Sequence, residues 1–265
     1  MDRDDPPRGG PAPEAPLIPL GRLPLAALDG AGPLILFLDL DGTLAPFVAD
    51  PADARVPAPA RRAIARLRRA GHTVVLVSGR RARDAARVAG VATDGVLGSH
   101  GAECLRGARV TPWLGRVGDR RRVAAAAARI RSALAGHPGV RLEDKTWSLA
   151  VHFHSGPARV RELARRVRRA AADPRLVVKA GRQVVDVRPR GIDKGRAVRR
   201  WLGPRPPRGR VLCAGDDTTD RDAFRAVAPL GWTIAVGRHV TGARYRAAGP
   251  AAFARWLVRL SERLA

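Results

Sequence analysis

Acidic side chains gather in two short stretches of the sequence, at spacings that suit phosphoryl transfer and metal binding. Asp39 and Asp41 stand two residues apart, and alternate residues of an extended chain point to the same side. A second stretch, 215–220, holds Asp216, Asp217 and Asp220. Clustered carboxylates repel one another unless a cation lies between them, and their hard oxygens favour Mg²⁺. The pattern predicts a pair of carboxylates beside a magnesium site.

A hydroxyl and an ammonium group complete this set. Ser78 and Gly79 lie between an apolar stretch and a helical one, where a hydroxyl and free backbone amides can hold a phosphate oxygen. Lys194 opens a predicted helix and is one of only three lysines among 49 basic residues; its compact charge suits a phosphate oxygen or a carboxylate. Each feature alone also fits an ordinary turn, cap or solvated helix end. Together they supply what transfer through an aspartyl-phosphate needs.

Apolar patterning predicts how these groups are brought together. Short apolar runs suit strands buried on both faces, and they occupy residues 33–38, 72–77, 95–98, 210–214 and 232–236. Helical spacing is found between or after them, at 59–70, 81–89, 194–202, 221–228 and 250–264. The order predicts an α/β fold with a doubly wound, Rossmann-like parallel sheet. The motifs follow the strands directly, at the edge where such sheets bind ligands.

The middle of the chain has a different pattern. Predicted helices at 119–135 and 160–172 are each followed by two predicted strands, an α+β order that does not continue a parallel sheet. We therefore expect an inserted α+β domain at 108–188 within a catalytic core formed by 34–107 and 189–265. Residues 1–33 show neither helical nor strand periodicity and predict a disordered or loosely packed tail.

Composition narrows the class of protein. The net charge of +25 invites a nucleic-acid interpretation, but arginine dominates the basic residues throughout and aromatic residues are only 4%, so stacking platforms are scarce. We expect no nucleic-acid partner. No apolar run approaches the ~20 residues of a membrane span, and the acidic start is unlike a secretory leader, which predicts a cytoplasmic protein without a membrane role. Cys104 and Cys213 are too few for a disulfide scaffold and suit small core positions.

The motifs resemble those of the haloacid-dehalogenase-like phosphatases, in the same order along the chain: 39–44, 78–80, Lys194 with its preceding loop, and 215–220. The resemblance implies that Asp39 is the nucleophile and Asp41 the general acid and base. It implies that the phosphoryl group is held by Ser78, Gly79 and Lys194. Mg²⁺ would be bound by the Asp39 and Asp216 carboxylates and the Asp41 carbonyl, with Asp217 and Asp220 supporting the metal site.

The residues around the inserted domain resemble the trehalose-6-phosphate phosphatase family more specifically. The matching stretches are 99–103, 143–152, 185–195 and 215–224. The resemblance implies that the inserted domain is a cap over the leaving group, and that the sugar is bound by His100, Glu143, Lys145, Asp186 and Arg188. The cap residues also fit ordinary surface charges on strands. Three residues depart from the family pattern: Arg221, His154 and Asp186.

Alternative functions remain open at this point. Another capped sugar-phosphate phosphatase, acting on sucrose phosphate or a mannosylglycerate-type phosphate, would use the same core motifs. A silent sugar-phosphate sensor would keep the fold without turnover, and a nucleic-acid-binding module would show salt-dependent DNA retention without Mg²⁺. The resemblance also leaves open whether the chain works beside a trehalose-6-phosphate synthase.

Overall fold

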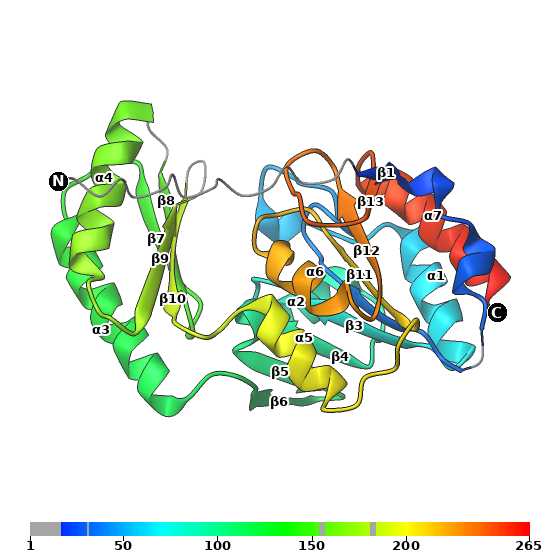
Figure 1. The fold of residues 1–265 in the computed structure, drawn as a ribbon. Coiled ribbons are helices and arrows are strands. Elements are labelled where there is room, and N and C mark those ends of the chain that lie inside the picture. The colour runs from blue at the N-terminus through cyan, green and yellow to red at the C-terminus, as the bar shows by residue number, and fades with distance from the viewer. Residues whose placement is uncertain (1–16, 31, 154–156, 181–183) are drawn as a thin grey trace, which may run out of the picture.

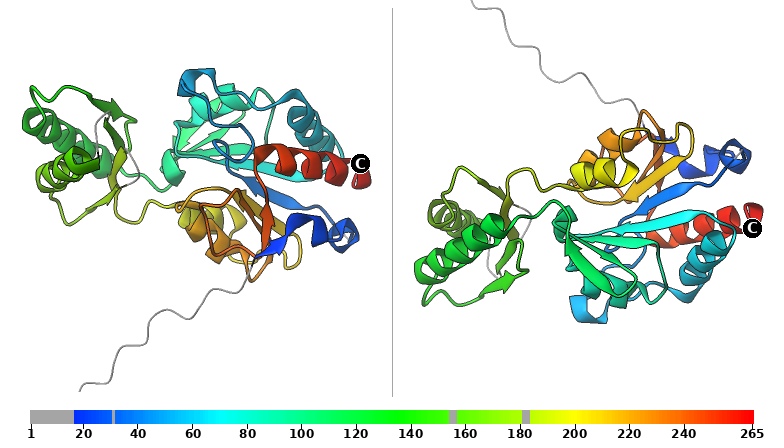
Figure 2. Two further views of the ribbon diagram at one scale, coloured as in Figure 1. Left: turned by 90° about the horizontal axis from the view of Figure 1, so that it is seen from above. Right: turned by 90° about the horizontal axis from the view of Figure 1, so that it is seen from below.

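The chain folds into two lobes of unequal size, joined by two crossings of the backbone (Figures 1 and 2). The computed structural model describes residues 17–30, 32–153, 157–180 and 184–265. The larger lobe contains a nine-stranded sheet and the smaller lobe a four-stranded sheet. The small lobe is inserted between the two parts of the large one, so both crossings lie on the same side of the core.

The core sheet is parallel over most of its width. Across the sheet the strands are β1 (Ile18–Pro19), β13 (Tyr245–Ala247), β12 (Gly231–Val236), β11 (Val211–Gly215), β2 (Ile35–Leu38), β3 (Thr73–Val77), β4 (Gly95–Gly98), β5 (Glu103–Arg106) and β6 (Arg109–Pro112). All neighbours from β1 to β4 pair in parallel, and only β5 and β6 are antiparallel. The chain winds outward from β2 in both directions, which confirms the predicted doubly wound α/β class.

Helices cover both faces of this sheet, which explains why its strands are continuously apolar. One face carries α1 (Ala58–Arg69), α2 (Ala82–Ala89) and α7 (Pro250–Arg263), and the other α5 (Lys194–Leu202) and α6 (Asp220–Val227). Within β2, Leu36 and Leu38 pack on the first face and Phe37 on the second. A strand buried on both sides needs apolar residues at every position.

The small lobe is an antiparallel sheet with helices on one face only. Its strands run in the order β7 (Val140–Asp144), β8 (Leu149–Phe153), β10 (Val184–Pro189) and β9 (Leu176–Ala180). Two helices, α3 (Val117–Ala133) and α4 (Pro157–Ala170), lie on the side away from the core (Figure 1). Leu149 and Val151 pack under them, so the alternate residues of β8 face the core lobe.

The prediction of a loose tail is wrong from residue 17 onward, whereas residues 1–16 lie outside the described part. Ile18 and Pro19 pair with β13. Short 3-10 helices at Leu20–Arg22 and Leu25–Leu28 follow, and the side chains of Leu20, Leu23 and Leu28 are buried. These leucines have neither a strand nor an α-helical period, because tight 3-10 turns set their spacing.

The predicted boundary between residues 107 and 108 is also wrong. β5 and β6 form a hairpin on the edge of the core sheet, so the inserted lobe begins only after Pro112. The hairpin escapes an analysis based on apolar runs because its strands are four residues long and carry Glu103, Arg106 and Arg109. The edge strand on this side of the sheet is β6, and charged side chains are common on edge strands, where they discourage pairing with another chain.

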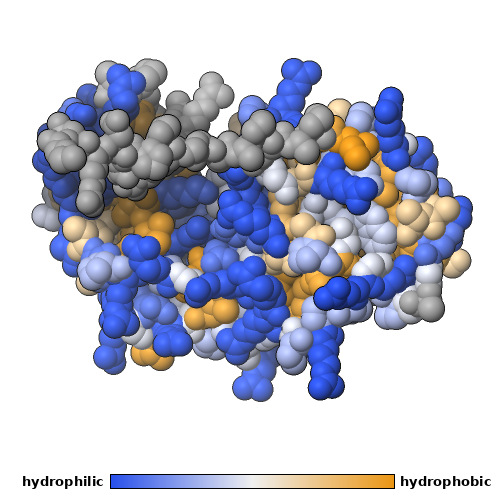
Figure 3. Space-filling view, in the orientation of Figure 1, coloured by the Kyte–Doolittle hydropathy of each residue, from blue (hydrophilic) through white to orange (hydrophobic). Residues whose placement is uncertain are grey.

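The surface is strongly hydrophilic on the face drawn in Figure 3. Three large apolar side chains are exposed among the described residues: Phe47, Val48 and Val117. Cys104 and Cys213 are buried free thiols, as their apolar surroundings predict. Within the described residues, none of the helices combines the length and the apolar character that a bilayer crossing requires.

Candidate active site

A cleft of about 360 Å³ lies between the carboxyl edge of the core sheet and the uncovered face of the small sheet. Most of the residues selected from the sequence line it: Asp39, Asp41, Gly79, His100, Glu143, Lys145, Asp186, Lys194, Asp216 and Asp217. Four selected or noted residues are not among the lining: Ser78, Arg188, Asp220 and Arg221. A fifth, His154, lies outside the described residues.

Asp39, Lys194 and Asp220 form a buried ionic chain below the cleft. Asp39 directly follows β2, and Lys194 is the first residue of α5. The Lys194 ammonium donates to Asp39 Oδ1 and to Asp220 Oδ1, both at 2.7 Å, and only 3% of its side chain is exposed. Burial alone would lower the pKa of Lys194, but the two carboxylates raise it overall. The ammonium therefore stays charged and fixes one oxygen of Asp39.

The carboxylates of Asp39, Asp216 and Asp220 approach one another closely enough to share a cation. One oxygen from each lies within 4.8 Å of the others. Burial and the charge of Asp39 raise the pKa of Asp216 to about 9, because a desolvated carboxylate beside other carboxylates resists ionisation. A divalent cation would offset this repulsion, and the carboxylates of Asp39 and Asp216 are hard ligands of the kind that Mg²⁺ prefers. The donor set fits the predicted metal.

Gly42 allows the two acidic stretches to meet. Its φ is +80°, and a Cβ at this position would lie 2.2 Å from Asp216 Oδ2. Asp220 arranges the other side, where its Oδ2 accepts hydrogen bonds from the backbone amides of Asp216 and Asp217. Asp220 thus has both oxygens engaged, by Lys194 and by the loop.

Asp41 is held by an arginine that the sequence analysis did not select. Arg80 Nε donates to Asp41 Oδ2 and Arg80 Nη2 to Asp41 Oδ1, each at 2.7 Å. Arg80 Nη1 also donates to the carbonyl of Pro51. The guanidinium is therefore tied to the loop after β2 at three points, and it fixes the plane of the Asp41 carboxylate.

Gly79 and His100 line the cleft, whereas the buried Ser78 lies outside its lining. Ser78 is 1% exposed, and its hydroxyl accepts the amide of Arg80. The His100 ring lies against Gly79, where an added Cβ would be 2.9 Å from the ring. His100 has a φ of +59°, and burial together with the positive charges of Arg188, Lys194, Lys145 and Lys179 lowers its pKa well below the usual value. The ring is neutral and can accept a hydrogen bond from a hydroxyl.

The register of the small sheet places charged side chains in a row facing the core. Ala150 pairs with Glu143 on one side and Asp186 on the other, and Asp186 pairs with Lys179. The residue between the two acids is small, so a space is left between their side chains. Burial raises the pKa of Asp186. Arg188 lies on the same face of β10, two residues further from the cleft lining.

Glu143 is organised by two neighbours. His152 Nε2 is 3.0 Å and Lys145 Nζ 3.6 Å from Glu143 Oε2. The hydrogen bond to His152, helped by the Lys145 charge against the cost of burial, lowers the pKa of Glu143 to about 2. This carboxylate is ionised at neutral pH and accepts hydrogen bonds, which suits the hydroxyls of a polyol.

Arg80, His152 and Phe47 are among the lining residues that were not selected as site residues from the sequence. Arg80 stood within the Ser-Gly-Arg motif, but in so arginine-rich a chain its type carried no signal. His152 stood within a motif stretch without an assigned role. Phe47, which is 75% exposed at the cleft, lies in a loop where an isolated aromatic residue predicts nothing specific.

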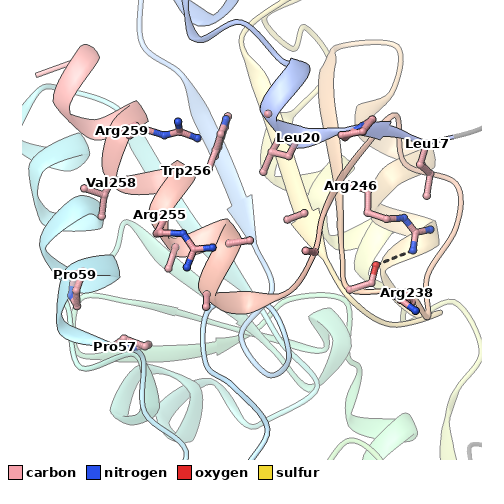
Figure 4. Close-up of a pocket in the computed structure, with 18 residues that line it drawn as sticks. Leu17, Leu20, Pro57, Pro59, Arg238, Arg246, Arg255, Trp256, Val258 and Arg259 are labelled. Carbon is pink, nitrogen blue, oxygen red and sulfur yellow. Dashed lines mark hydrogen bonds between the residues drawn. The ribbon is translucent and has the colours of Figure 1, made fainter.

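A larger groove of about 1110 Å³ lies on another part of the core, between α7 and the segment that contains β1. Figure 4 shows Leu20, Trp256 and Val258 in its wall and Arg255 and Arg259 one helical turn apart on α7. None of the described residues that line it is acidic or nucleophilic. The groove therefore lacks the groups that phosphoryl transfer needs, and the smaller cleft is the candidate active site.

The paired carboxylates after the first core strand, the buried lysine and the acidic loop occupy the carboxyl edge of a doubly wound sheet with a cap. This combination places the chain among haloacid-dehalogenase-like proteins. A hydrolase of that type from Bacteroides thetaiotaomicron has the same fold, with a TM-score of 0.63 at 16% identity over 86% of this chain and 100% of that chain. The family model for trehalose-phosphatase matches residues 37–248, and the chain belongs to this family.

Relatives agree with that assignment. A trehalose-phosphate phosphatase from Mycobacterium marinum is 34% identical over 248 residues, which are 86% of this chain and 62% of that protein. The chain thus spans less than two thirds of that relative's length. The C-terminal domain of trehalose-6-phosphate phosphatase from C. albicans shares the fold, with a TM-score of 0.80 at 22% identity over 94% of this chain and 99% of that chain.

Proposed function

We propose that this chain is a magnesium-dependent phosphatase that hydrolyses trehalose 6-phosphate to trehalose and phosphate through an aspartyl-phosphate. The single observation that carries the proposal is the shared cleft. Asp39, held by Lys194, lines one wall, and the row of Glu143, Ala150 and Asp186 lines the other. One wall has the groups for phosphoryl transfer, and the other has acceptors for sugar hydroxyls. Membership in the trehalose-phosphatase family supports trehalose as that sugar.

In the first step, an oxygen of Asp39 forms a bond to phosphorus and the bond from phosphorus to the sugar oxygen breaks. The sugar oxygen takes the electron pair and receives a proton from Asp41. Lys194 offsets charge at Asp39 and near the phosphoryl oxygens, while Ser78 and Gly79 would orient those oxygens. The products of this step are trehalose and the aspartyl-phosphate of Asp39.

In the second step, a water oxygen forms a bond to phosphorus and the bond to Asp39 breaks, which restores the carboxylate. Asp41 takes the proton from that water and is ready for the next cycle. Asp39 and Asp216, with the Asp41 carbonyl, would hold Mg²⁺, which would supply positive charge to offset the phosphoryl oxygens and to keep Asp39 ionised. Asp217 and Asp220 would support that arrangement.

The cap surface is the basis for the choice of sugar. Glu143 and Asp186 flank the small Ala150, and Lys145 donates into the same space. His100 offers a neutral ring from the core side. Acceptors and donors that face each other across a narrow cleft match a neutral polyol, whose hydroxyls both donate and accept. The cap also excludes water while the phosphoryl group is transferred.

The test is phosphate release from a panel of substrates, with Mg²⁺ and with EDTA. The panel contains trehalose 6-phosphate, glucose 6-phosphate, sucrose 6-phosphate and p-nitrophenyl phosphate. A Mg²⁺-dependent preference for trehalose 6-phosphate supports the proposal. A preference for another sugar phosphate would keep the core chemistry and overturn the interpretation of the cap. The absence of turnover on every substrate would overturn the enzymatic proposal and favour a sugar-phosphate sensor.

A further inference from the structure

The Arg80 side chain makes a strong contact in the cleft, with Asp41, that the two reaction steps above do not use. Both of its hydrogen bonds to Asp41 are 2.7 Å long. Only 17% of the Arg80 side chain and 30% of the Asp41 side chain are exposed. The pair is therefore partly shielded from water, which makes it stronger than an ion pair on an open surface.

The backbone around Arg80 fixes where its guanidinium lies. The amide of Arg80 donates to the Ser78 hydroxyl, which belongs to the turn after β3. At the other end, Arg80 Nη1 donates to the carbonyl of Pro51 at 2.9 Å, on the loop that follows Asp41. Arg80 thus links the Ser78 turn, through its backbone amide, to that loop, through its guanidinium, and it holds Asp41 at a set distance from the residues expected to bind phosphate.

Asp41 has a demanding geometric task in the proposed reaction. Its carboxyl group must point first at the sugar oxygen and then at the attacking water. Between these two events, the nearby Asp39 is bonded to phosphorus. Asp41 lies in a glycine-containing loop, and its side chain is less buried than that of Asp39. Without a partner, this carboxylate could adopt several rotamers, and most of them would not reach the reacting oxygens.

We propose that Arg80 is a positioning residue for proton transfer: its two-pronged contact aims the Asp41 carboxyl group at the leaving oxygen and at the hydrolytic water. The inference rests on the proposed function. Arg80 itself need not touch the substrate. A lysine cannot replace it fully, because a single ammonium group cannot fix the plane of a carboxylate as a planar guanidinium does.

The test compares two substrates whose leaving groups differ in their need for a proton. The p-nitrophenolate ion leaves without one, whereas the sugar oxygen of trehalose 6-phosphate requires it. In Arg80→Ala, the first turnover of p-nitrophenyl phosphate should remain fast while hydrolysis of the aspartyl-phosphate becomes slow. Rapid-quench or stopped-flow measurement should then show a burst of about one p-nitrophenolate per enzyme, which a loss of phosphate binding could not produce.

With trehalose 6-phosphate, the same variant should show no burst, and its kcat should fall by roughly 10²-fold, at the lower end of what general acid and base catalysis contributes. Its KM should change little. Arg80→Lys should lie between the variant and the parent. Arg83→Ala is the matched control, because Arg83 is an exposed arginine of α2 that contacts the carbonyl of Ala108 and lies outside the cleft.

Two results would overturn the inference while leaving the proposed function intact. One is an equal loss of first-turnover rate on both substrates in Arg80→Ala, which would assign Arg80 to phosphate binding. The other is parental kcat on trehalose 6-phosphate. Thermal unfolding of each variant shows whether it is folded, and Arg80→Lys repeats the test if the alanine variant is not. A parent chain inactive on every substrate would instead overturn the proposed function, and the inference with it.

Discussion

The core and the cap treat their charged groups in opposite ways. In the core, Lys194 is 3% exposed and is clamped between two carboxylates at 2.7 Å. In the cap, Glu143 is 41% exposed, and its partners are His152 on the neighbouring strand and Lys145 just after the end of β7. The core charges are assembled before any ligand arrives, whereas the cap charges still have open hydrogen-bonding capacity. In the proposed reaction, the core groups that act in every turnover are therefore already in place. The cap groups proposed to bind the sugar remain hydrated until the sugar binds.

The largest expected effect is on the core side. Asp39→Asn keeps the size of the side chain but replaces the nucleophilic carboxylate with a neutral amide, so phosphate release should fall by roughly 10⁴-fold or more, as for other nucleophile replacements. The loss should be the same for trehalose 6-phosphate and p-nitrophenyl phosphate, because both need the nucleophile. A variant that lost only the sugar phosphate activity would contradict the division between core and cap.

The Lys194→Met variant tests how much the buried ammonium contributes to the stability of the folded chain. Removing the ammonium leaves Asp39 and Asp220 buried without their partner, which should lower the free energy of unfolding by about 3–5 kcal/mol. Urea unfolding in EDTA, at neutral pH, measures this loss. Added Mg²⁺ should narrow the gap to the parent, since a dication would offset the same carboxylates. A loss that is small in EDTA would show that the clamp contributes little.

Glu143→Gln sharpens the comparison from the cap side. Loss of one charged acceptor for a sugar hydroxyl should cost about 1.5–3 kcal/mol of binding, which lowers kcat/KM for trehalose 6-phosphate by roughly 10–100-fold. Activity on p-nitrophenyl phosphate should stay at the parental level. Glu162→Gln is the matched control, because Glu162 pairs with Arg166 on α4, away from the cleft. Equal losses on both substrates would place Glu143 in the core chemistry instead.

The smallest expected effect concerns His100, which lies where the two regions meet. Burial lowers its pKa in the folded state, so below the unfolded-state pKa of ~6.5 the unfolded chain binds a proton that the folded chain does not. Stability should therefore fall as the pH drops below about 6.5, by up to ~1.4 kcal/mol per pH unit. Asparagine tolerates the left-handed backbone at this position. The variant His100→Asn should therefore lose this part of the pH dependence of stability.

Urea unfolding of the parent and of His100→Asn between pH 5 and pH 8 measures that difference. The two curves should run parallel above pH ~7 and converge toward acid. Parallel curves over the whole range would show that His100 becomes protonated as easily when folded as when unfolded. Other histidines, such as the half-buried His72, contribute equally to both curves and cancel.

The sequence was most informative about site residues that directly follow a strand with a recognisable apolar pattern. Asp39 and Asp216 follow strands whose continuous apolar character marks them as central, so the meeting point of these acids could be predicted. The Arg80–Asp41 contact could not, because one arginine among so many carries no information and the pairing joins residues 39 positions apart. The burial of Leu20 and Leu28 was missed for a similar reason: tertiary contacts, rather than a repeating pattern, hold that segment in place.

The alternation along β8 has a consequence for how such a protein can diversify. Leu149, Val151 and Phe153 face the helices, whereas Ala150 and His152 face the cleft. The residues that pack against the helices and the residues that face the cleft are therefore different ones. The first set contributes to stability, and the second can change selectivity. Ala150 illustrates this independence, since lengthening that one side chain would shorten the space between Glu143 and Asp186. A lineage could thus exchange one sugar for another by small steps, each of which leaves the fold intact.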